Sequence, residues 1–588
     1  MSNEQKSAKT APEAVRPTVA SDPLGFCHDL GEEISKETLA MGQETLASPL
    51  SPMALVPAFA DIAAHVAAAP AYAAEMAQAA AQQGLGALSG DEDGLLSPDD
   101  HRFADPAWRA PPFSLFARNF LATEHWLDTC LQHAPGVSEK HAKLAAFAAR
   151  QWLDAFSPSN LPWTNPEILR TTFAQGGANF LRGLSHMASD ARRQMSPKLP
   201  SGDAFVVGRD LATTPGKVVL RNELMELIQY APSSPQTRPE PLLIVPAWIM
   251  KYYILDLSPQ NSLIRYLVGR GFTVFCISWR NPGAELAETT FDDYRRLGPV
   301  AALDAIASIC GGTQGTTQKV HTLGYCLGGT LLSVAAAALA RDGDKRIATV
   351  GMLAAQTDFT EPGELKLFID EQQLDELDKI MARQGYLDAR QMASAFSMLR
   401  ARDLVWSRMV KLYLLGEEEH PNDLMAWNAD ATRMPYRMHS QYLRSLFLHN
   451  DLAEGRFEAG GRKVDLQAIK APIFALGTER DHVAPWRSAF KIVRLNSGDI
   501  TFALASGGHN SGIVSEPGHH NRSYRIGHRP KGEPAPTPDE FWAKAVQKPG
   551  SWWPAYADWL DGFSGPFGPP PPMGRALCDA PGTYVLQS

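Results

Sequence analysis

A cysteine lies at the centre of the sequence GYCLGG, residues 324–329. The apolar run before it is typical of a strand ending at Leu323, and a helical run starts near Leu327, so Cys326 occupies the turn between them. Small residues at 324 and 328 allow strand and helix to approach closely, and the residue at the tip of such a turn projects above the sheet. Because a helix N-terminus stabilises a thiolate, we expect Cys326 to be a nucleophile and the backbone N–H of Leu327 to face an oxyanion. The alternative is a buried structural cysteine.

A cysteine nucleophile needs a base, and two later segments supply the residue types. FALGTERDHVAPW places Asp481 after a predicted strand, and FALASGGHNSGI places His509 after the next one. The carboxyl ends of neighbouring parallel strands meet at one edge of a sheet, so we expect these residues to meet Cys326 there. His482 is the competing base, but it adjoins Asp481 in the sequence, and we interpret it as a loop residue.

Strand-like and helical stretches alternate from about residue 205 onward. Apolar runs such as PLLIVPAW, FTVFCISW and KVHTLGYC are each followed by a helical pattern. This predicts a mostly parallel sheet covered on both faces. Residues from about 360 to 445 are helical, which predicts a cap inserted before the sheet resumes near Ile473. Core packing of the last helix is our interpretation of three residues near the end of the chain: Trp552, Trp553 and Trp559.

The first third of the chain has a different pattern. Residues 1–22 are polar and rich in Pro, Ala and Ser, which predicts a disordered tail. Residues 23–204 are interpreted as a helical N-terminal domain, because FSLFARNFLATEHWLDTCLQHA and AKLAAFAARQWLDAF carry apolar residues at helical spacing. We expect this domain to act as a scaffold or to contact a dimer partner or polymer. The catalytic domain is predicted for residues 205–588.

Composition narrows the classes of function. The length of 588 residues exceeds what one hydrophobic core holds, and 44% hydrophobic with 20% charged residues is ordinary for a globular protein. A net charge of -9 argues against nucleic-acid binding. The six cysteines include no C-x-x-C pair, so we expect neither a disulfide framework nor a metal site. An alanine-rich stretch, 62–88, is interrupted by His65, Pro70 and Glu75, so we predict no transmembrane helix; the N-terminus is not read as a signal peptide.

Several motifs resemble those of polyhydroxyalkanoate synthases, the polyester polymerases of bacterial storage granules. They are GYCLGGT, KYYILDLSPQNSL, FTVFCISWRNP, ARDLVW, DLMAWNADATRMP, RDHVAPW, SGGHNSGI and GSWWPAYADWL. The resemblance covers residues from about 100 to about 562 and is to the class I enzymes, which work with a single type of subunit. It implies an α/β-hydrolase catalytic domain with a helical cap insertion, preceded by a mostly helical N-terminal domain. It also carries the family's nucleophile, aspartate and histidine onto Cys326, Asp481 and His509.

The chain departs from the family pattern at three points. Arg480 stands where the family often has Glu, SGGH carries an extra glycine, and Trp248 in PAWIMKYYI replaces a common cysteine. Trp248 and Ile249 lie in the turn that lines the oxyanion site of related folds, so we assign them, with Leu327, to oxyanion or substrate binding. This departure bears on acyl chain length and not on the reaction. The segment HHNRSYRIGHR is interpreted as a solvated loop, with attraction of coenzyme A phosphates as the alternative.

The resemblance implies that the chain polymerises (R)-3-hydroxyacyl-CoA into a polyester through an acyl group on Cys326, with coenzyme A as a product and no cofactor. It also implies a homodimer that uses short acyl chains and works in the cytoplasm, on a growing polyester chain at the granule surface. One alternative is an acyl-CoA thioesterase, which a product assay distinguishes. The other is a granule-bound structural protein with an inactive site, which selective alkylation of Cys326 would exclude.

Overall fold

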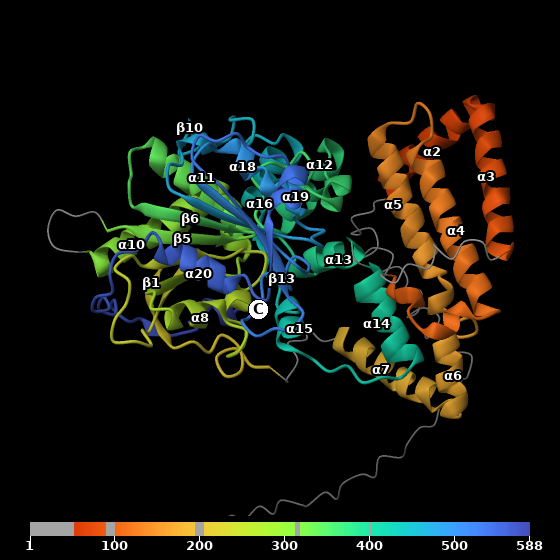
Figure 1. The fold of residues 1–588 in the computed structure, drawn as a ribbon, viewed down its shortest axis with the longest axis horizontal. Coiled ribbons are helices and arrows are strands. Elements are labelled where there is room, and N and C mark those ends of the chain that lie inside the picture. The colour runs from red at the N-terminus through yellow and green to blue at the C-terminus, as the bar shows by residue number, and fades with distance from the viewer. Residues whose placement is uncertain (1–51, 90–99, 195–204, 312–317, 400) are drawn as a thin grey trace, which may run out of the picture. The chain divides into compact units, whose positions relative to one another are not determined.

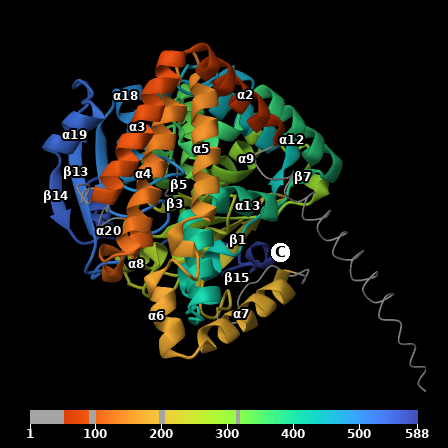
Figure 2. The ribbon, with the colours of Figure 1, turned by 90° about the vertical axis from the view of Figure 1, so that its right-hand side faces the viewer.

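The computed structural model describes residues 52–89, 100–194, 205–311, 318–399 and 401–588. The predicted disordered tail, residues 1–22, lies outside these ranges. The helices of the N-terminal region are α2 (Pro52–Ala68), α3 (Pro70–Ser89), α4 (Phe113–Gln132), α5 (Glu139–Ala155), α6 (Pro166–Ala174) and α7 (Ala178–Gln194). Helices α3, α4 and α5 lie side by side (Figure 1 and Figure 2). The described part of this region contains no strand, which confirms its predicted helical character.

Local sequence explains where these helices begin. The hydroxyl of Ser138 accepts a hydrogen bond from the backbone N–H of His141 at the start of α5. The side chain of Asn165 accepts two such bonds at the start of α6, where proline follows it directly. These side chains bind N–H groups that have no partner within the helix, and proline has no N–H to satisfy there. The boundary predicted at residues 204 and 205 adjoins undescribed residues and stays a prediction.

A large mixed sheet forms the centre of the C-terminal region (Figure 1). Across the described residues its strand order is β14-β13-β12-β11-β6-β5-β3-β4-β2-β1-β15. Neighbours from β12 through β4 are parallel, and the strands outside them pair antiparallel. The parallel strands are β3 (Leu242–Val245), β4 (Val274–Trp279), β5 (Val320–Tyr325), β6 (Ile347–Leu353), β11 (Ile473–Thr478) and β12 (Ile500–Ala505). The antiparallel strands are β1 (Gly216–Arg221), β2 (Met225–Tyr230), β13 (Ser523–Arg529), β14 (Val546–Pro549) and β15 (Cys578–Asp579).

The predicted sheet is confirmed at its centre, but the antiparallel strands were not expected. The interpretation of HHNRSYRIGHR as a solvated loop is wrong, because this segment contains β13. Its residues pair with β12 from Tyr524, opposite Ala505, to Arg529, opposite Ile500. The charged side chains hide this strand from a hydrophobicity pattern, yet Arg529 is buried, and its guanidinium donates to the carbonyl oxygens of Asn496 and Gly498.

Helices pack on both faces of the sheet, as predicted. One hydrophobic core includes α10 (Ala301–Cys310), α11 (Leu327–Arg341) and α18 (Ile492–Leu495). The other includes α8 (Leu263–Gly269) and the last long helix, α20 (Trp553–Asp561). Trp552 and Trp553 are completely buried in this second core, and Trp559 packs against Phe474. The prediction that these tryptophans serve core packing is therefore confirmed.

A helical insertion separates β6 from β11, and the sheet resumes at Ile473 as predicted. It contains α12 (Glu371–Gln384), α13 (Ala389–Leu399), α14 (Ser407–Met409), α15 (Asp423–Asn428) and α16 (Tyr436–Tyr442), followed by the π-helix η11 (Leu443–Leu448). The insertion also holds two pairs of two-residue strands that were not expected. They are β7 (Tyr386–Leu387) with β8 (Met434–Pro435), and β9 (Glu458–Ala459) with β10 (Arg462–Lys463).

Cysteine pairing and membrane-spanning potential can both be assessed in the described residues. Free thiols are present at Cys130, Cys276, Cys310, Cys326 and Cys578. No single described helix is long and apolar enough to cross a membrane. Helices α2 and α3 pass that test only as a pair, and a bend of 100° separates them.

Candidate active site

Cys326 occupies a strained turn between strand β5 and helix α11. Its backbone has φ +52° and ψ −122°, a conformation that residues other than glycine rarely adopt. Its N–H donates to the carbonyl of Leu353 on β6, and its carbonyl accepts from Gly329 and Thr330 in the first turn of α11. These bonds fix the strained residue from both sides, so the side chain is presented at the carboxyl edge of the sheet. The predicted turn is confirmed, although β5 extends to Tyr325.

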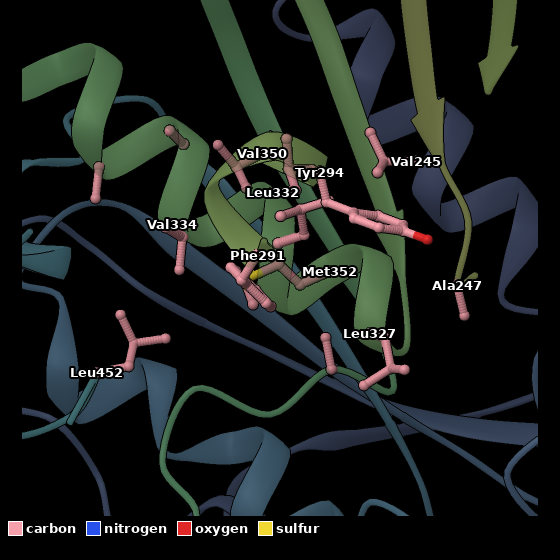
Figure 3. Packing of buried hydrophobic residues seen from close by; sticks show 14 of the residues in the cluster. Val245, Ala247, Phe291, Tyr294, Leu327, Leu332, Val334, Val350, Met352 and Leu452 are labelled. Carbon is pink, nitrogen blue, oxygen red and sulfur yellow. The ribbon is translucent and has the colours of Figure 1, made fainter. Parts of the chain in front are cut away.

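Two glycines make this turn possible, as the sequence predicted. A Cβ atom at Gly324 would lie 2.4 Å from the Cα of Gly329, and one at Gly328 would lie 2.1 Å from the carbonyl oxygen of Val245. Neither distance is compatible with a side chain. Because Gly328 touches the end of β3, the start of α11 lies directly beside the turn that follows β3. Figure 3 shows part of the hydrophobic core that includes Leu327, with Tyr294 and Leu332 among its members.

The structure brings His509 and Asp481 together at the same edge. Nδ1 of His509 lies 2.8 Å from Oδ2 of Asp481, and the side chain of Asp481 is fully buried. The carboxylate also accepts bonds from the Thr478 hydroxyl at 2.9 Å and from the backbone N–H groups of Val483 and Ala484 at 2.9 and 2.8 Å. Each carboxylate oxygen of Asp481 therefore accepts two hydrogen bonds, and these four bonds fix the position of the side chain. Thr478 and the turn at 483–484 were not predicted as parts of the site.

The charges of these groups stabilise one another. Burial alone would raise the pKa of Asp481, but the His509 ring and the hydrogen bonds to the carboxylate hold that pKa below its ordinary value. Burial alone would lower the pKa of His509, but the charges of Asp481 and Cys326 raise it well above its ordinary value. The contribution of Cys326 to this shift places the sulfur within electrostatic reach of the His509 ring. Since Nδ1 faces Asp481, Nε2 is the nitrogen left for the sulfur.

Two tryptophans of the C-terminal region hold the loop that carries His509. The indole N–H of Trp552 donates to the carbonyl of Gly512 at 2.9 Å, and that of Trp553 donates to the carbonyl of Ile513 at 3.0 Å. Buried indoles need such partners. Sequence reasoning placed these tryptophans in the core but missed this second role, because the acceptors are backbone atoms about 40 residues away in the chain.

The residues assigned to the oxyanion site lie at the same sheet edge. Leu327 is the first residue of α11, so its backbone N–H belongs to the turn whose N–H groups have no partner within the helix. Trp248 and Ile249 follow β3, and their carbonyls accept hydrogen bonds from the hydroxyl and the N–H of Thr432. The indole of Trp248 is buried against Tyr294, at a ring distance of 5.0 Å, and against neighbouring aromatic rings. The indole is therefore part of the hydrophobic core, while the backbone of Trp248 contacts the insertion through Thr432.

The insertion reaches the candidate nucleophile. Burial raises the pKa of Tyr442 well above its ordinary value, and the charge of Cys326 raises it further, so this phenol of α16 lies within electrostatic reach of the sulfur. Met438 and Phe447 are buried beside it in the same core. His482, in contrast, is exposed, and the bond of Asp481 goes to His509. The choice of His509 over His482 as the partner of Asp481 agrees with this geometry.

Two regions of the chain match known protein families. Residues 240–516 match the family model described as alpha/beta hydrolase fold, and residues 99–267 match that of the poly-beta-hydroxybutyrate polymerase (PhaC) N-terminus. The parallel sheet, the strand–turn–helix around Cys326 and the first match define an α/β-hydrolase fold. A solved monoacylglycerol lipase of Paleococcus ferrophilus aligns with 58% of this chain and 99% of its own, at 14% identity and a TM-score of 0.31.

Two curated relatives identify the family within the α/β-hydrolase fold. The poly(3-hydroxyalkanoate) polymerase of Methylorubrum extorquens is 43% identical over 497 residues, which are 83% of this chain and 81% of its own length. The poly(3-hydroxyalkanoate) polymerase subunit PhaC of Cupriavidus necator is 37% identical over 497 residues, 83% of either chain. The chain belongs to the poly(3-hydroxyalkanoate) polymerase family.

Proposed function

We propose that the chain polymerises (R)-3-hydroxyacyl-CoA into a polyester and releases coenzyme A, by way of an acyl group held on Cys326. The observation that carries this proposal is the bond between Nδ1 of His509 and the buried Asp481, at the sheet edge where Cys326 occupies its strained turn. Membership of the polymerase family supports the reaction class. The order of the three residues along the chain also agrees with an α/β-hydrolase site.

The first half of the reaction loads the enzyme. His509 takes the thiol proton of Cys326, and the thiolate attacks the thioester carbonyl. A new carbon–sulfur bond forms to Cys326, the bond to coenzyme A breaks, and His509 returns the proton to the departing thiolate. The N–H of Leu327 stabilises the negative oxygen between these steps. One thioester replaces another, so the acyl group stays activated, which explains why cysteine suits this site better than serine.

The second half extends the chain. His509 takes the proton of a 3-hydroxyl group, and the hydroxyl oxygen attacks the acyl carbon on Cys326. An ester bond forms and the thiolate of Cys326 leaves, to be protonated again by His509. Asp481 keeps the ring in the tautomer that presents an acceptor nitrogen to the sulfur and stabilises the cation that forms. Four hydrogen-bond contacts to this carboxylate support that role.

Polymerisation requires that water be kept from the acyl group. We assign this task to the insertion between β6 and β11, because Met438, Tyr442 and Phe447 bury apolar surface in the core that contains the start of α11. Loosening it should raise the yield of free hydroxyacid relative to polyester. We further propose short acyl chains, a homodimer, no cofactor, and a cytoplasmic location at the surface of polyester granules.

The test supplies purified protein with 3-hydroxybutyryl-CoA and longer homologues and records coenzyme A, free hydroxyacid and insoluble polyester. We expect coenzyme A and polyester from the wild type and from Cys310→Ala, which removes a partly buried thiol outside the site. Cys326→Ala should keep its fold and release no coenzyme A. Free hydroxyacid as the main product would support a thioesterase instead, and turnover by Cys326→Ala would exclude the covalent route.

A further inference from the structure

A second set of side chains connects the nucleophile turn to the loop of the base. Tyr325 precedes Cys326, and its hydroxyl donates to Oδ1 of Asn510 at 2.7 Å. Asn510 follows His509, and its amide donates to Oδ1 of Asn428 at 3.4 Å. The neighbours in sequence of the nucleophile and the base are thus bonded directly to each other.

The ring of Tyr325 also supports the base. It lies 5.7 Å from the imidazole of His509, centre to centre, with 33° between the two planes. Tyr325 is almost completely buried, and burial together with the charges of Cys326 and Asp481 raises its pKa well above the ordinary value. Its hydroxyl therefore stays protonated and needs an acceptor, which Asn510 supplies.

Asn428 connects Tyr325 and Asn510 to the helical insertion. Asn428 ends α15, and residues on both sides of it are attached to the turn after β3. The indole of Trp427 donates to the carbonyl of Lys251 at 2.7 Å, and Thr432 donates to the carbonyls of Trp248 and Ile249. The segment 427–432 consequently contacts the loop after β12 through Asn428 and the loop after β3 through its own backbone and side chains.

We propose that Asn510 is a positioning residue: its bond to Tyr325 sets the His509 ring over Cys326, and its bond to Asn428 relates that position to the insertion. This inference rests on the proposed function, since it assigns Asn510 to the same reaction. Trp552 and Trp553 hold the loop farther along, at residues 512 and 513, so the Tyr325 bond is the restraint adjacent to the base itself.

The test compares Tyr325→Phe, Asn510→Ala and the double variant, with Tyr413→Phe as the control. Tyr325→Phe keeps the ring beside His509 and removes only the hydroxyl. Tyr413→Phe removes a hydroxyl bonded at 2.7 Å to Asp190, outside the site. Two measurements are made on each protein: coenzyme A release from 3-hydroxybutyryl-CoA, for kcat and KM, and the rate of Cys326 alkylation by iodoacetamide without substrate, across pH.

We expect each single variant to lower kcat about threefold to tenfold, the effect of one hydrogen bond, with KM changed less than twofold. The double variant should lose no more than the worse single variant, because both remove the same bond. Alkylation should slow at each pH tested, since a displaced imidazole assists the Cys326 sulfur less. Asn428→Ala should have a smaller effect, about twofold, because its bond is long and exposed.

Three results would overturn the inference: wild-type kcat in Tyr325→Phe, losses that multiply in the double variant, or an alkylation profile that matches the wild type. A lower melting temperature with unchanged alkylation would assign Asn510 a purely structural role and reject the proposal. Failure of the proposed function would look different. It would give hydroxyacid as the product of every variant, while the alkylation rates, measured without substrate, would still report the position of His509.

Discussion

Replacing Asp481 with asparagine should disable the site while leaving its shape intact. One carboxylate oxygen accepts from the backbone N–H groups of Val483 and Ala484, and the other faces Thr478 and His509. In the variant, the asparagine oxygen satisfies the two backbone donors, which turns its NH₂ group toward His509. Nδ1 must then be an acceptor, so the proton moves to Nε2, the nitrogen that should accept the thiol proton. The base is present in the wrong tautomer and lacks its counter-charge.

The size of the effect follows from these contacts. A hydrogen bond to a charged group contributes about 1.5–3 kcal/mol, which corresponds to about 10- to 150-fold in rate. The tautomer change adds to this loss and approaches the roughly 10⁴-fold drop that the equivalent change causes in a serine triad. We therefore expect kcat of Asp481→Asn to fall between about 10²-fold and 10⁴-fold. The melting temperature should fall, because the charge that pairs with His509 is lost, but the fold should persist because the backbone contacts of the side chain are retained.

Coenzyme A release, measured by chromatography, is the appropriate assay, since thiol reagents would also react with Cys326. Asp499→Asn is the matched control: Asp499 accepts from Nε2 of His528 at 3.1 Å, away from the site, and its variant should keep wild-type kcat. A loss of less than threefold in Asp481→Asn, with an intact fold, would refute the assignment of Asp481 as the partner of the base.

Three further predictions concern the turn, a glycine of α3 and the base. Gly328→Ala places a Cβ against the carbonyl oxygen of Val245, so it should cost about 1–3 kcal/mol of stability and abolish activity. Gly84→Ala has open space around its Cβ and should be neutral to stabilising in thermal melts. The raised pKa of His509 stabilises the fold fully below about pH 6.5, and this contribution is lost as pH rises through that raised value. Urea unfolding should therefore show the largest stability difference between wild type and His509→Gln near pH 6 and a shrinking one at higher pH; a difference that grows with pH would contradict the assigned shift.

The centre of the fold was predictable because its signals are local. The apolar runs of β3 and β5 indicate buried strands by themselves. The glycines on either side of Cys326 indicate a tight turn between strand and helix. Asp481 and His509 were identified because each follows such a run. Because parallel strands end at the same edge of a sheet, Cys326, Asp481 and His509 were expected to lie near one another.

The parts that sequence reasoning missed depend on contacts between distant segments. Strand β13 carries Arg525, His528 and Arg529, whose charges hide it, and its position follows from pairing with β12. The bonds from Trp552 and Trp553 to the His509 loop use backbone acceptors that no residue pattern records. The role of Asn510 could not be predicted either, because nothing in the sequence of its loop indicates that the Tyr325 hydroxyl lies against its side chain.

In the proposed mechanism the sulfur of Cys326 carries the acyl group between the two halves of the reaction. The most direct measurement mixes the enzyme with 3-hydroxybutyryl-CoA, quenches it in acid within seconds, digests it and weighs the peptide that contains residue 326. We expect the mass of one or more 3-hydroxybutyryl units on that peptide, removable by hydroxylamine and absent from Cys326→Ala. Polyester formed while this peptide stays unmodified, or an acyl group found on another residue, would contradict it.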